Sequence, residues 1–152
     1  MNSGEQKRWN DLLYAKMNEL FQTIRDIKRF SSSLRLNWSI IGKEEVNMID
    51  FIAVEVIRVF APAFYNSIAG NKTFFTNSDP FSLGTIGKDT TKVQEERRQK
   101  YDSLLSKVPE EIREIIDKMT QNLFPQLLSS NHGSDWHSEW RAERRVCAEE
   151  RF

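Results

Sequence analysis

The run Met48–Phe60 constrains the fold of this chain more than any other segment. Drawn as a helix, it is apolar around nearly its whole circumference, which is typical of a helix buried in a core. Its β-branched residues leave a buried strand as the alternative, but its length and its charged Asp50, Glu55 and Arg58 favour a helix. Each of these charges needs a partner in such a setting, and Glu55 and Arg58 have the spacing of an intrahelical pair. We therefore predict a core helix here, capped at its start by Asn47.

The rest of the chain predicts further helices around this one. Apolar residues recur every three or four positions over 5–21, 23–36, 90–108, 109–124 and 136–146, and a short helix over 62–69 opens at Pro62. The stretch 71–89 is rich in Gly, Ser and Asn and is predicted as a long loop. No other segment suggests a strand. The expected fold is all-α, an irregular bundle of about six or seven helices with one long loop.

Composition limits the class of protein. A chain of 152 residues suits one domain, and 22 Lys plus Arg balance 22 Asp plus Glu, which excludes a strongly basic protein of the histone or ribosomal kind. The single cysteine, Cys147, excludes an intrachain disulfide and fits a reducing compartment. The start of the chain lacks the apolar segment of a signal peptide, and no apolar run is long enough to cross a bilayer. We expect a cytoplasmic domain.

The sequence holds no recognisable catalytic or metal site. There is no GxxxxGK[ST] or GxGxxG pattern. His132 and His137 could be drawn as metal ligands with Asp135, but their spacing of five suits shared ligation poorly, and we expect surface histidines and no metal. Nothing around Cys147 activates a thiol, so we expect a small buried apolar residue there.

One charged feature stands out, on the helix predicted over 23–36. Thr23 can cap this helix with Asp26, and Ile24, Ile27, Phe30 and Leu34 form its apolar base. Over 23–43 the chain has five cations and one anion, a net charge of 5 − 1 = +4, as Arg25, Lys28, Arg29, Arg35 and Lys43 against Asp26. The cations are either a solvated surface or a phosphate site, because guanidinium groups match phosphate oxygens.

Three blocks of sequence resemble the KAP family of P-loop NTPases, in family order. The first is FQTIRDIKRFSSSLRL at 21–36, and the second is EVNMIDFIAVEVIRVFAPAFY at 45–65. The third comprises LFPQL at 123–127, then Trp136, Trp140 and RRVCAEERF at 144–152. These blocks are similar to the region of KAP proteins that lies downstream of the nucleotide-binding core.

The resemblance implies a role within a larger ATPase. KAP proteins carry their Walker motifs, ATP and Mg²⁺ in an N-terminal P-loop core, and this chain has neither Walker motif. We expect 1–152 to be a single helical domain from the C-terminal part of such a protein, with lid-like helices over 1–70, the loop 71–89 and C-terminal helices over 90–152. Alone it would bind no cofactor and be inactive, whereas the complete protein would be an ATPase, cytoplasmic or on the cytoplasmic side of a membrane.

The same resemblance assigns the candidate site. A helical lid in related P-loop classes often presents an arginine to the nucleotide phosphates, and by that analogy Arg25 would contact phosphate, with Arg29 second and Lys28 beside them. The expected partner is the P-loop core, and membrane attachment through other segments or a homo-oligomer is compatible with it. Two alternatives stay open: a nucleic-acid-binding helical module that uses these cations and Arg35, and a plain protein-interaction domain with the glycine-rich loop as its contact surface.

Overall fold

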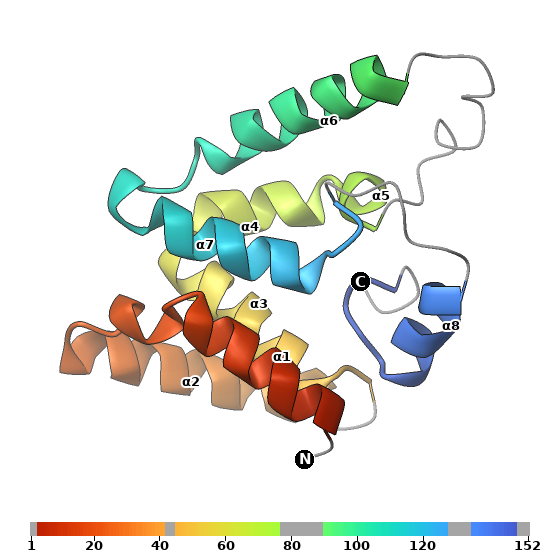
Figure 1. The fold of residues 1–152 in the computed structure, drawn as a ribbon. Coiled ribbons are helices and arrows are strands. Elements are labelled where there is room, and N and C mark those ends of the chain that lie inside the picture. The colour runs from red at the N-terminus through yellow and green to blue at the C-terminus, as the bar shows by residue number, and fades with distance from the viewer. Residues whose placement is uncertain (1–2, 42–44, 77–89, 128–134, 149–152) are drawn as a thin grey trace.

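The structure, a computed structural model, describes residues 3–41, 45–76, 90–127 and 135–148. Within these ranges all regular structure is helical, which confirms the all-α prediction. The elements are α1 (Ser3–Tyr14), the 3-10 helix η1 (Met17–Leu20), α2 (Ile24–Ile41), α3 (Met48–Phe60), α4 (Pro62–Ala69), α5 (Lys72–Phe75), α6 (Thr90–Leu105), α7 (Glu110–Leu123) and α8 (Asp135–Ala142). Figure 1 shows α3 between α2 on one side and α4 and α7 on the other.

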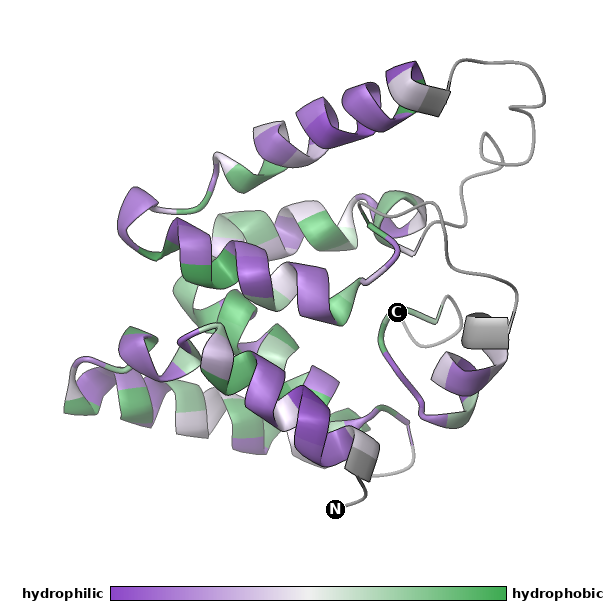
Figure 2. Ribbon diagram, viewed as in Figure 1, coloured by the Kyte–Doolittle hydropathy of each residue, from purple (hydrophilic) through white to green (hydrophobic). Residues whose placement is uncertain are grey.

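The helix α3 is the centre of the core, as its apolar circumference predicts. It contacts α1, α2, α4 and α7, and Ala53 and Val56 are fully buried. It is among the most hydrophobic helices in Figure 2. Asn47 caps it, since its Oδ1 accepts a hydrogen bond from the Ile49 backbone at 3.0 Å. The backbone N–H of Asn47 donates to the Arg144 carbonyl at 2.8 Å, so the start of α3 is tied to the C-terminal segment.

The first predicted helix is interrupted. Lys16 lies in the left-handed region, with φ of 63°, and separates α1 from η1. An ordinary side chain is disfavoured in that conformation, so the chain adopts it where packing requires a change of direction. Around this break Ala15 is buried, as are Met17 and Leu20 of η1. The continuous helix predicted over 5–21 is therefore wrong at Lys16, where the chain changes direction.

The first residues of the predicted long loop are helical instead. Lys72–Phe75 forms the short helix α5, which buries Phe74 and Phe75 against α4 and α6. The apolar side chains of this segment favour burial over an open loop. Residues 77–89 lie outside the described part of the chain.

In the C-terminal half, two helices end earlier than the sequence predicts. α6 ends at Leu105 instead of 108, and α8 ends at Ala142 instead of 146. Pro109 precedes the first turn of α7, which carries Glu110 and Glu111 where the helix dipole favours acidic residues. No helix in the described ranges combines the length and the apolar character needed to cross a membrane.

Candidate functional site

The candidate site is the outer surface of α2. Its first turn is fixed by the predicted capping box: Thr23 donates through its backbone N–H to Asp26 Oδ2 at 3.0 Å, and the Asp26 backbone N–H donates to Thr23 Oγ1 at 3.2 Å. This cap sets the helical register in which Arg25 and Arg29 lie four residues apart on the solvent side.

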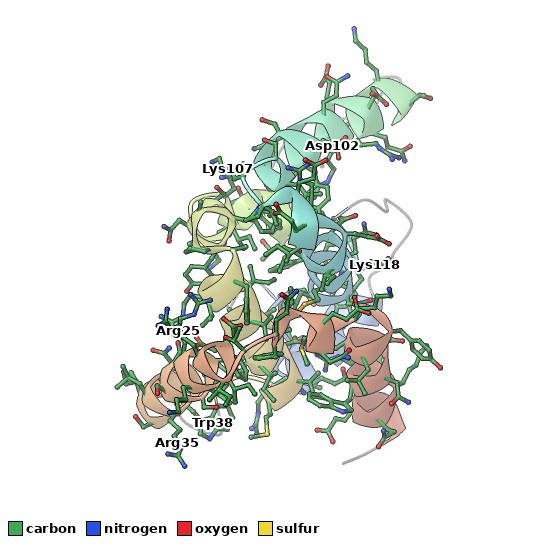
Figure 3. The ribbon with its side chains drawn as sticks, turned by 90° about the vertical axis from the view of Figure 1, so that its left-hand side faces the viewer. Arg25, Arg35, Trp38, Asp102, Lys107 and Lys118 are labelled. Carbon is green, nitrogen blue, oxygen red and sulfur yellow. The ribbon has the colours of Figure 1, made fainter. Side chains whose placement is uncertain are left out.

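The three predicted site residues come together on this surface. Arg25, Lys28 and Arg29 are all exposed, and together with Ile24 and Ser32 they line a shallow hollow of about 520 Å³. Figure 3 shows Arg25 and Arg35 at the outer margin of the molecule. We call Arg25, Lys28, Arg29 and Ser32 the cationic surface of α2.

The three cations differ in whether they already interact with another side chain. The Arg29 guanidinium lies 4.0 Å from Asp26 Oδ1 and 5.3 Å from the centre of the Phe60 ring, so its charge is shared with a carboxylate and an aromatic face. Arg25 and Lys28 form no ion pair with any residue in the described ranges. Arg25 and Lys28 are therefore the two cations of this surface that have no carboxylate partner among the described residues.

The apolar base predicted for this helix is not buried. No residue of α2 is buried; Ile24 is 72% exposed and Ile27 is 50% exposed, whereas Phe30 and Leu34 are half-buried. Periodicity identifies which side chains share a face, but the burial of that face depends on a neighbour, which Ile24 and Ile27 lack among the described residues.

A polar cluster joins α2 to α3 instead. Glu55, which is 4% exposed, accepts hydrogen bonds from Ser33 Oγ at 2.9 Å and from Asn37 Nδ2 at 3.1 Å. Arg58 pairs with Glu55 at 2.8 Å, as its spacing predicts, and also donates to Ser33 Oγ. The hydrogen bond to Glu55 raises the pKa of Arg58. We call these four residues the Glu55 cluster.

Asp50 is the second buried carboxylate of α3, and it joins α1 to the segment after α8. Asp50, 2% exposed, pairs with Arg8 of α1, lies 3.5 Å from Arg145 Nε, and accepts a hydrogen bond from the Val146 backbone at 2.9 Å. Burial, and then the nearby charge of Arg145, lower the pKa of Arg8 to about 10. The sequence indicated that Asp50 needs a partner but gave no signal for Arg8 or Arg145.

An apolar pocket lies at the opposite end of α2. It measures about 800 Å³ and is mainly apolar, between the end of α2 and the helices α3, α4 and α7; its walls include Ile40, Ile41, Phe51, Ile68 and Phe124. No pattern in the sequence identified it, although the apolar pair Ile40–Ile41 at a helix end is consistent with it. It holds no concentration of cations and is separate from the cationic surface.

Only some of the residues considered for metal or thiol chemistry lie in the described part of the chain. No group of three or more His, Cys, Asp or Glu side chains gathers in the described portion of the chain. His132 lies outside that portion, and so do the side chains of His137, Asp135 and Trp136. Cys147 is buried, which confirms its prediction, and burial raises the pKa of its thiol. Trp140 is also buried.

The chain was compared with protein-family models, curated proteins and solved structures, and no match was found in any of the three. The assignment of function therefore depends on the residues of the chain and their arrangement.

Proposed function

We propose that this chain is the helical lid of a KAP-type P-loop ATPase, and that α2 contacts nucleotide phosphates or couples their hydrolysis to a change of conformation. The observation that carries the proposal is the cationic surface of α2, on which Arg25 and Lys28 are exposed and have no ion-pair partner in the described part of the chain. The resemblance of segments 21–36 and 45–65 to KAP sequences supports the same role.

The chemistry of the surface suits a phosphate. A guanidinium placed against the oxygens of a phosphoryl group stabilises the negative charge that develops during transfer. Arg25 would be the main contact, Lys28 a second point charge, and Arg29, already close to Asp26, the weakest of the three. Lid position would then depend on the terminal phosphate, so that hydrolysis becomes a conformational signal.

The chain alone should not hydrolyse ATP. Its sequence has no phosphate-binding loop, and ATP and Mg²⁺ would bind to the P-loop core of the complete protein. Measurement of phosphate release by the purified chain tests this. Turnover that disappears in Arg25→Ala would contradict the proposed dependence on a core.

In the complete protein, Arg25→Ala should lower ATP turnover by about tenfold or more, because a preorganised contact to the transferring phosphoryl group is lost. The matched control is Arg98→Ala, which removes an exposed arginine from α6. Circular dichroism would check that the fold is intact. Wild-type turnover in Arg25→Ala would remove this residue from the mechanism.

Nucleic-acid binding is a second candidate, because four exposed cations lie on one helix: Arg25, Lys28, Arg29 and Arg35. A titration with duplex DNA and with single-stranded RNA at two salt concentrations separates the candidates. Phosphate-backbone binding weakens steeply as salt rises. The absence of salt-sensitive association would eliminate this candidate and leave the lid proposal unaffected.

A further inference from the structure

The helix α2 buries less of itself against the rest of the molecule than the helices α3 and α7 do. None of its 18 residues is buried, whereas seven of the 13 residues of α3 and five of the 14 residues of α7 are. Segments with few buried apolar contacts open at lower free energy than the core does. By this criterion α2 is less firmly attached than α3 or α7.

The contacts that hold α2 are polar and aromatic, and the polar ones sit near its middle. The Glu55 cluster joins Ser33 and Asn37 of α2 to Glu55 and Arg58 of α3. Two aromatic contacts flank it, with Phe30 5.1 Å from Phe21 and Trp38 5.0 Å from Phe51, measured between ring centres. The cluster is therefore the main polar connection between the two helices.

When the Glu55 cluster opens, its hydrogen bonds within the protein are replaced by hydrogen bonds to water. Ser33, Asn37 and Arg58 can replace their bonds to Glu55 by bonds to water, and the Glu55 carboxylate regains hydration that burial removes. Ile24 is already largely in water, so it adds little cost. The N-terminal cap, Thr23 with Asp26, lies at the start of α2 itself and breaks no bond to the body when the helix moves.

We propose that α2 opens and closes on the body as a unit of its own, with the Glu55 cluster as its latch. The use of this movement rests on the proposed function, because it would carry Arg25 and Lys28 toward or away from a phosphate. The movement itself requires no nucleotide, and it can be tested on the chain alone.

Amide hydrogen exchange of the purified chain tests the latch. An opened α2 has lost its packing, and a lone helix of this length frays in water, so its amides exchange. We expect α2 amides to exchange about tenfold or more faster than those of α3 and α7. Ser33→Ala removes a hydroxyl that bonds to Glu55 and should accelerate exchange in α2 alone, by about tenfold. Asn37→Ala should act in the same direction.

The control is Ser31→Ala, the same chemical change at an exposed position on the same helix, which should leave exchange nearly unchanged. The proposal is overturned if α2 exchanges as slowly as α3, if Ser33→Ala has no effect, or if it accelerates α2, α3 and α7 together. If hydrogen exchange shows that α2 opens but Arg25→Ala has wild-type ATP turnover in the complete protein, only the proposed function is overturned. A rigid α2 with impaired turnover would overturn the latch only.

Discussion

At the residue scale, the charges of α3 show what spacing alone can predict. Glu55 and Arg58 are three residues apart, and they form the expected pair at 2.8 Å. The partners of Asp50 lie on other elements: Arg8 is 42 positions away, and Arg145 belongs to the C-terminal segment. Local spacing carries no information about such long-range pairs, so the sequence predicts the need for a partner without identifying it.

Removal of the Asp50 carboxylate should destabilise the chain strongly. Asp50→Ala leaves Arg8 and Arg145 without the carboxylate that they share, and the loss of one partner of a buried ion pair costs about 3–5 kcal/mol. Urea unfolding would measure this, with Asp102→Ala, at an exposed position of α6, as the control. A loss below about 1 kcal/mol, the range of exposed pairs, would contradict the structural role assigned to Asp50.

Tyr101 should make stability depend on alkaline pH. Burial, and then its hydrogen bond to Asp117 at 2.7 Å, raise the pKa of Tyr101 above its ordinary value of 10.0. The folded chain then holds this proton more tightly than the unfolded chain does, so the contribution is complete below the unfolded pKa of about 10 and is lost as the pH rises beyond it.

The comparison with Tyr101→Phe isolates this effect. Unfolding free energies measured between pH 9 and 11 should show a wild-type advantage that shrinks by up to about 1.4 kcal/mol per pH unit above the unfolded pKa. An advantage that stays constant over this range would mean that the phenol is not held in its protonated form by the fold.

At the element scale, the positions of most helices were predictable from the sequence, whereas the burial of each helix face was less so. The capped start of α3 and the capping box of α2 follow from local residue types, and both are confirmed. The break at Lys16 requires a left-handed residue imposed by packing, and periodicity does not indicate one. The same limit explains the apolar base of α2, whose pattern is helical although Ile24 and Ile27 remain exposed.

The Asn47 cap should contribute measurably to stability. Its side chain accepts from the Ile49 backbone and donates to the Glu143 carbonyl at 3.3 Å, so it joins α3 to the segment after α8. Asn47→Ala should lower the free energy of unfolding by about 1–2 kcal/mol. Asn18→Ala, at an exposed position of η1, is the matched control. Equal effects of the two substitutions in chemical denaturation would show that the cap contributes nothing specific.

At the scale of the whole molecule, the all-α class and the core position of α3 were predictable from hydropathy patterns, whereas the assembly was not. The contacts that join distant segments, such as Gln126 with the carbonyls of Thr76 and Cys147 at 2.7 and 3.2 Å, depend on the completed fold. The candidate cations were found from the sequence because α2 brings Arg25, Lys28 and Arg29 together locally. The apolar pocket is assembled from several helices that are distant in sequence, so it could not be found in this way.

The most direct test of the proposed role of α2 is discrimination between ATP and ADP by the complete protein. If Arg25 contacts the terminal phosphate, the ratio of the two dissociation constants should change by about tenfold or more toward ADP in Arg25→Ala, because a charge-assisted hydrogen bond is lost with ATP only. Arg98→Ala should keep the wild-type ratio. An unchanged ratio in Arg25→Ala, with the protein folded, would contradict the account.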